Sequence, residues 1–160
     1  MHENLVGSRG GNIVLTKTGL RGATETASRL NSAATPGLAN FAIEGVMYNA
    51  VLDTALNGVA WSSGHEVVGV NNACVFAVWI NAGNTVTTTQ GPQVSQVDVA
   101  ASRAVVPLPP VVADKALLGL VKVSTNNGQT FTAGVSCLNA ANTTVTYYDT
   151  AFMPSKPFTS

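Results

Sequence analysis

The sequence predicts an all-β fold, a single domain built as a β-sandwich or jelly-roll-like body with an extended N-terminal arm. Three observations lead to this prediction. Charged residues are 10% of the chain, against about 25% in an average soluble domain, and Val and Thr, which favour strands, are frequent. Asn127 and Gly128 lie between two strand-like runs, which is a strong hairpin signal. The run Cys74–Ile80 is apolar at every position, as in a strand covered on both faces.

The length of 160 residues suits one domain, which would bury roughly 68–70% of the surface of its unfolded chain. We divide the chain into an extended arm at residues 1–40, a β-rich body at 41–150 and an extended C-terminal strap at 151–160. The strap contains Pro154 and Pro157, which disfavour a regular element.

The arm is rich in Gly, Ser, Thr and Ala and lacks strong periodicity. We expect a strand within Asn12–Lys17 and one or two helical turns within Thr24–Leu30. The arm is predicted to bind a partner or a neighbouring subunit, because its apolar residues would otherwise be exposed; the alternative is an unattached terminus. The residues proposed for this contact are Arg9, Ile13, Val14, Leu15, Lys17, Arg21 and Arg29.

The first half of the body is predicted to hold several strands. Short strands are expected at Glu44–Leu52, Val59–Trp61 and Glu66–Val70, and Trp61 is expected in the core rather than on a ligand platform. In the central strand at 74–80, residues 74, 76, 78 and 80 face one side and 75, 77 and 79 the other. A return strand at Thr85–Gln90 would expose a face of threonines.

The second half of the body is predicted to repeat this hairpin. Leu117–Ser124 would pair with Gln129–Thr132 across the Asn-Gly turn, with Thr143–Asp149 as a third strand. The segments at 78–91 and 121–134 therefore suggest an internal duplication. Between the hairpins we expect a strand over residues 94–99 and an extended crossing between sheets at Val105–Val112, where three prolines exclude a central strand.

No motif in the sequence indicates catalysis, and we predict a protein that is not an enzyme. The carboxylates are scattered, and the two histidines are far apart in the sequence, so no metal or cofactor is predicted. Cys74 and Cys137 are expected as free thiols, with no disulfide. A thiol enzyme that pairs either cysteine with His65 remains the least favoured alternative.

The charge balance bears on partners and location. The formal net charge is zero, so we predict no nucleic-acid partner. No apolar run reaches the ~18 residues of a spanning helix, which predicts no membrane partner. No signal peptide is visible, so synthesis in the cytoplasm is expected. A neutral surface also tolerates close packing of many copies.

A run of features in the second half of the chain resembles small structural proteins of tailed bacteriophages, the capsid decoration (cement) or head-fibre proteins. The features are Pro110, Ala113-Asp114-Lys115, LGLVKV, a turn, TFTAG, Leu138-Asn139-Ala140-Ala141 and TVTYYD, with TVTTTQG at Thr85–Gly91 upstream. The resemblance covers roughly residues 40 to 150 and contains no chemical motif.

The resemblance implies a virion protein, assembled in the host cytoplasm, that binds the outside of the phage head and stabilises the expanded shell. Its partner would be the major capsid protein, and it would often be a homotrimer at local threefold positions. A head-fibre, tail-fibre or adhesin-type protein that binds a host surface glycan is the alternative. That alternative predicts exposed aromatic residues at Trp61, Tyr147 or Tyr148.

Overall fold

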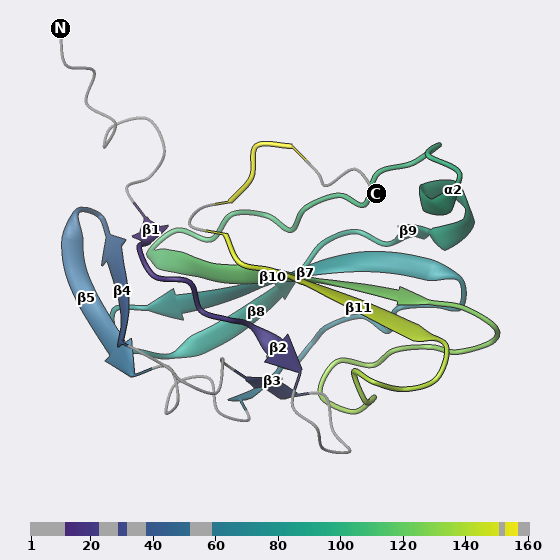
Figure 1. Cartoon of the computed structure of the whole chain (residues 1–160), viewed down its shortest axis with the longest axis horizontal. Helices are drawn as coiled ribbons and strands as arrows, with labels where there is room; N and C mark the ends of the chain where they lie inside the picture. The colour runs from purple at the N-terminus through teal and green to yellow at the C-terminus, as the bar shows by residue number, and fades with distance from the viewer. Residues whose placement is uncertain (1–11, 23–28, 32–37, 52–58, 151–152, 157–160) are drawn as a thin grey trace, which may run out of the picture.

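A five-stranded antiparallel sheet organises the molecule, as the computed structural model in Figure 1 shows. The structure describes residues 12–22, 29–31, 38–51, 59–150 and 153–156. In this sheet the strand order is β11-β10-β7-β8, and β9 also pairs with β7. The strands are β7 (Asn72–Asn81), β8 (Val86–Gln90), β9 (Val94–Ser95), β10 (Lys115–Thr125) and β11 (Thr143–Tyr148).

Strand β7 is the centre of the sheet, and its two faces lie in two separate apolar clusters. Cys74, Phe76, Val78 and Ile80 belong to the first cluster, whereas Ala73, Val75, Ala77 and Trp79 belong to the second. All eight side chains are buried. The predicted strand, its division into two faces and its cover on both sides are confirmed.

The first face is covered by a three-stranded sheet in the order β1-β4-β5, which comprises β1 (Ile13–Val14), β4 (Leu38–Ile43) and β5 (Val46–Val51). Phe41 and Ala39 are fully buried against β7 and β10 in the first cluster. A second small sheet, β2-β3-β6, contains β2 (Arg21–Gly22), β3 (Arg29–Asn31) and β6 (Val59–Ala60). These layers make the chain an all-β, sandwich-like single domain.

The second face is covered by irregular chain and one short helix, α2 (Gln96–Ala100). Val99 of the helix and Val106 of the proline-rich segment are buried there, and Met153 packs beside them. The segment at 105–112 was expected to cross between sheets; instead it lies over one face of the large sheet. Most of the predicted strap, residues 151–152 and 157–160, lies outside the described residues.

Two hairpins, β4–β5 and β7–β8, are closed by tight turns. In β4–β5, Glu44 and Gly45 form the two-residue turn with φ of 51° and 80°, so the strand expected at Glu44–Leu52 begins at Val46. In β7–β8, the hairpin closes around Asn84 with φ of 60°. Positive φ at these positions matches turns that follow the right-handed twist of the strands.

The expected hairpin at 117–132 is wrong in its second strand. The turn is present, with Asn127 at φ 47° and Gly128 at φ 81°, but β10 pairs with β11. Phe131 instead forms an isolated antiparallel bridge with Val68. The strand expected at 66–70 is reduced to this single bridge. Phe131 is fully buried against Trp61 and Phe76, and this burial outweighs local pairing. The proposed internal duplication therefore does not exist in the fold.

Two further expectations are corrected. The strand expected over 94–99 is a two-residue strand followed by helix α2, because the Ser95 side chain accepts the N–H of Asp98 and caps the helix. The threonines of β8 do not form an exposed face. Thr88 is 5% exposed, and Thr87 and Thr89 accept hydrogen bonds from Lys115 Nζ and Trp79 Nε1.

A bulge in β10 decides which side chains reach the first cluster. The register shifts between Leu117 and Gly119, which leaves Leu118 as the extra residue, so that Ala116 before the bulge and Val121 after it both enter the first cluster. Without the extra residue, every side chain beyond it would point to the other face. Gly119 itself packs closely against the end of β11. A Cβ at this position would lie 2.7 Å from the backbone oxygen of Tyr148.

We expect Gly119→Ala to destabilise the fold by about 1–3 kcal/mol, because the methyl group would push against rigid backbone. The matched control is Gly83→Ala in the β7–β8 turn, where the nearest atom to a Cβ is 3.5 Å away. Urea unfolding of the two variants and the wild type measures the difference. Equal stability of all three would contradict the close approach at Gly119.

Candidate partner-binding surface

The thiol and imidazole that sequence reasoning considered for catalysis are engaged elsewhere. Cys74 Sγ donates to the carbonyl oxygen of Gly91 at 3.1 Å, and burial raises the pKa of this thiol to about 11, so it stays protonated at neutral pH. His65 Nε2 lies 2.7 Å from Thr88 Oγ1. Neither Cys74 nor Cys137 forms a disulfide. The pairing that a thiol enzyme would need is absent at Cys74.

Of the residues expected to be exposed for glycan stacking, Trp61 is buried, and Tyr147 and Tyr148 are partly buried. Trp61 is 6% exposed and packs edge-on against Phe76, with ring centroids 4.7 Å apart. Tyr147 is half-buried beside Gly22, and burial raises the pKa of its hydroxyl. Within the described ranges, no three His, Cys, Asp or Glu side chains come together as a metal site would require.

Residues 12–22 of the predicted arm pack against the body of the same chain. Val14 and Leu20 are buried in the first cluster, at 3% and 5% exposure. The Thr18 hydroxyl lies 3.0 Å from the carbonyl oxygen of Leu118 and 2.7 Å from Asp149 Oδ1, and the N–H of Leu20 donates to the same carboxylate oxygen. We expected Val14 to be exposed unless a partner protein covered it. This expectation is wrong, because Val14 pairs with Phe41 and is covered by its own chain.

The same segment presents other side chains outward. Ile13 pairs with Ala42, and Ala42 pairs with Met47, so these residues share the outer face of the β1-β4-β5 sheet. Leu15, two residues after Ile13, is 57% exposed, and Met47 is 58% exposed. We call Ile13, Leu15, Ala42 and Met47 the Leu15 surface. Large apolar side chains gathered on one face are typical of an interaction site.

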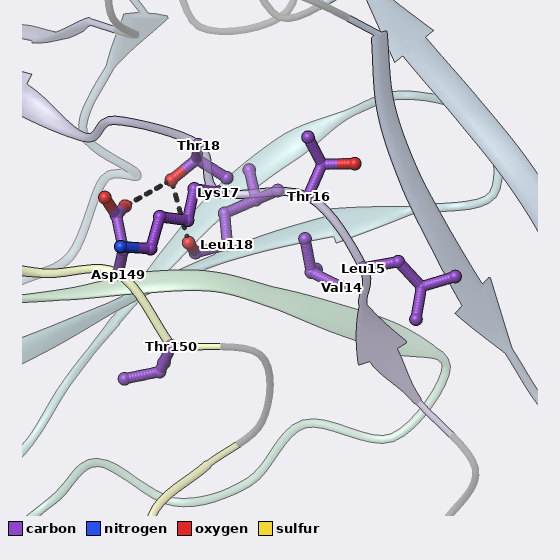
Figure 2. Close-up of a pocket in the computed structure, with 8 residues that line it drawn as sticks. All are labelled: Val14, Leu15, Thr16, Lys17, Thr18, Leu118, Asp149 and Thr150. Carbon is purple, nitrogen blue, oxygen red and sulfur yellow. Dashed lines mark hydrogen bonds between the residues drawn. The ribbon is translucent and has the colours of Figure 1, made fainter.

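A groove of about 250 Å³ runs beside this surface (Figure 2). Its walls are the segment Val14–Thr18 on one side and Leu118, Asp149 and Thr150 on the other. Figure 2 shows the Thr18 hydroxyl between the Asp149 carboxylate and the Leu118 carbonyl, while Leu15 points away from them. The lining of the groove thus combines apolar residues, among them Val14 and Leu118, with the charges of Lys17 and Asp149.

The structure brings together some of the proposed contact residues. Ile13, Leu15 and Lys17 lie together beside the groove, and Arg21 is exposed on β2, further along the segment. Arg9 lies outside the described residues, as do the side chain of Arg29 and most of the helical turns expected at 24–30. Sequence reasoning missed Met47, although the turn at Glu44 and Gly45 followed by strand alternation was a signal that could have placed it on the outer face.

Searches for related proteins gave no match to a family model, to a curated protein or to a solved structure. No helix in the described part of the chain is long and apolar enough to span a membrane. The candidate surface is therefore defined by the geometry of this chain alone.

Thr18→Val should destabilise the fold by about 1–3 kcal/mol, because the isosteric side chain removes the hydroxyl proton that the Leu118 carbonyl and the Asp149 carboxylate share. The control is Thr146→Val on β11, whose side chain is exposed and for which a change within about 0.5 kcal/mol is expected. Chemical denaturation measures both. A Thr18 variant as stable as the control would mean that this hydroxyl does not anchor the segment.

His65 should make the stability of the fold depend on pH. Burial lowers its pKa below 6.5 in the folded chain, so below pH 6.5 the unfolded chain binds the proton first. The stabilisation is therefore complete above about pH 6.5 and declines as the pH falls toward the folded-state pKa. His65→Gln keeps a side-chain oxygen that can accept from Thr88 but does not titrate.

The expected measurement is a flatter stability profile for His65→Gln than for the wild type between about pH 7 and pH 5. Carboxylates that titrate in this range contribute equally to both proteins and cancel in the difference. Parallel profiles would show that the imidazole has the same proton affinity in both states.

Proposed function

We propose that this chain is a structural binding protein, a capsid decoration (cement) protein that attaches to the outside of a phage head and stabilises the expanded shell. The observation that supports this most is the Leu15 surface. Ile13 and Leu15 lie on the segment that the sequence singled out for partner contact, Met47 shares the same face of the sheet, and the large apolar side chains of Leu15 and Met47 are more than half exposed.

The chemistry of the rest of the molecule agrees with a binding role. Cys74 is held protonated and His65 is paired with Thr88, so neither resembles an activated catalytic group. The net charge of zero favours contacts through apolar burial and shape over electrostatic steering. A neutral polar surface is also compatible with dense packing on a lattice.

The partner would be the major capsid protein, which the Leu15 surface would contact through burial of Leu15 and Met47. Lys17, beside the groove, would orient the contact by pairing with an acidic group. Assembly as a homotrimer at threefold positions is the arrangement that the sequence resemblance implies. By mass action, a protein that binds only the expanded lattice shifts the equilibrium toward that lattice.

The test is co-sedimentation of the purified protein with unexpanded and expanded shells assembled from the major capsid protein of the same genome. We expect binding to expanded shells and little to unexpanded ones, together with a higher melting temperature of the decorated shells. Absence from both shell pellets at micromolar protein would contradict the proposal.

Leu15→Asp and Met47→Asp should each weaken shell binding by roughly 10- to 100-fold, because each removes the burial of one large apolar side chain. Val135→Asp is the matched control: Val135 is 71% exposed and lies in a turn away from the Leu15 surface. Binding isotherms on expanded shells measure the three variants. If all three bind like the wild type, the shell contact lies elsewhere on the molecule.

A further inference from the structure

The loop between β6 and β7 is tied through one threonine to β8, the last strand in the order of the large sheet. The N–H of Ser62 donates to Thr88 Oγ1 at 3.0 Å, and the N–H of Thr88 donates to Ser62 Oγ at 2.8 Å. His65 Nε2 lies 2.7 Å from the same hydroxyl oxygen of Thr88. The loop therefore covers a backbone group of β8 through contacts that all converge on Thr88.

Both ends of this loop are held by other contacts. At one end Trp61 is buried in the first cluster. At the other end the Gln90 side chain bonds the N–H and the carbonyl oxygen of Glu66, at 2.7 and 3.0 Å. Between them Ser63 and Gly64 are exposed, and Gly64 turns the chain with φ of 85°. A release confined to residues 62–65 would leave both of these anchors in place.

The contact between His65 and Thr88 depends on the protonation state of the ring. A threonine hydroxyl has one proton to donate, and its oxygen also accepts. When His65 is neutral with its proton on Nδ1, Nε2 accepts the Thr88 proton while the Thr88 oxygen accepts from Ser62. In the imidazolium both ring nitrogens are donors. Nε2 then no longer accepts, and the hydroxyl proton of Thr88 loses this acceptor.

The surroundings of the His65 ring also oppose a positive charge. The ring lies against those of Phe76 and Trp61, with centroids 5.4 and 6.4 Å away, and burial lowers the pKa of the imidazole. On β7, β8 and residues 59–68, which pack around the ring, the other ionisable groups are the protonated Cys74 thiol and the Glu66 carboxylate. A carboxylate favours the charged ring, so burial, which lowers the pKa, decides the direction.

We propose that residues 62–65 form an acid-sensitive latch on β8, in which protonation of His65 releases Ser62 from Thr88 and uncovers this part of the strand. Above about pH 6.5 the ring is neutral and the latch stays closed. In the released loop the ring is solvated and its pKa returns to about 6.5, so below this pH the released loop binds the proton first. Each further pH unit then shifts the ratio of released to closed loops by up to tenfold toward release, until the pH passes the lower pKa of the closed loop.

The latch goes beyond the proposed function and is independent of it. The Leu15 surface lies on the β1-β4-β5 sheet, and residues 62–65 do not line the groove beside it. The latch also differs from the effect of His65 on the stability of the whole fold, because the large sheet stays intact when the loop is released. Local openings of this kind are separate from global unfolding and cost less free energy.

Hydrogen exchange of single amides, followed by NMR on the full chain between pH 7 and pH 5, tests the latch. After correction for the intrinsic effect of pH on exchange, we expect the amides of Ser62 and Thr88 to lose protection, by up to tenfold per pH unit. Low urea concentrations should leave their exchange unchanged, because a local opening exposes little surface. The amide of Val121, which lies on β10 between β7 and β11, should be better protected and more sensitive to urea.

Two histidine variants assign the effect to one ring. His65→Gln keeps a side-chain oxygen that accepts from Thr88 but does not titrate, so the protection of Ser62 and Thr88 should stay constant between pH 7 and pH 5. The matched control is His2→Gln, which removes the other histidine of the chain and should retain the acid-dependent loss of the wild type.

Protection of Ser62 and Thr88 that does not change with pH would overturn the latch, as would an equal loss in folded His65→Gln. A loss that Val121 shares, with the same urea dependence, would reject it in favour of global unfolding. Protection that rises in acid would reject it too, because the aromatic rings would then stabilise the charged imidazole. If circular dichroism shows that His65→Gln is unfolded, NMR titration of the remaining ring in His2→Gln decides, and a midpoint at or above pH 6.5 would reject the latch.

Discussion

The burial of β7 on both faces is the constraint on which the rest of this structure depends. A strand with no polar face cannot remain at a solvated surface, so the chain must supply a layer on each side of it. On one side the layer is the β1-β4-β5 sheet, and on the other it is helix α2 and the segment at 105–112. Residues 12–22 of the N-terminal segment are part of this cover, through Val14 and Leu20.

The bulge in β10 follows from the same constraint. Ala116 and Val121 are an odd number of residues apart, and an unbroken strand would send them to opposite faces. The shift between Leu117 and Gly119 brings both to the first cluster, where Leu20 from the N-terminal segment lies close to Gly119. The position of the segment, and with it of the groove, is therefore coupled to the lack of a side chain at Gly119.

The features that sequence reasoning predicted are those fixed by neighbours in the chain. The all-β class, the two faces of Cys74–Ile80 and the Asn-Gly turn at 127-128 each depend on a few consecutive residues. The partner of β10 could not be read in this way, because two runs, Gln129–Thr132 and Thr143–Asp149, had suitable composition. Burial of Phe131 beside Trp61 and Phe76 decided between them, and that is a long-range interaction.

The candidate surface was predicted in part for a similar reason. Sequence reasoning selected Ile13, Val14 and Leu15 together because all are apolar, but strand alternation separates them. Val14 faces the core, whereas Leu15 is exposed. Met47 joins Leu15 only through two strand pairings, β1 with β4 and β4 with β5. Such a combination across three strands needs the sheet order, which no local pattern contains.

The low charge of the chain also explains how its sheet edges are managed. Most proteins protect edges with lysine or other charges, and this chain has few to use. Threonine, serine, asparagine and glutamine take over that task, as Thr88 with Ser62 and Thr18 with Leu118 illustrate. A side-chain hydrogen bond covers one backbone group at a time and needs a segment nearby to supply it. Among the described residues, no side chain hydrogen-bonds to the backbone of strand β5, so this kind of edge cover is seen beside β8 and β10.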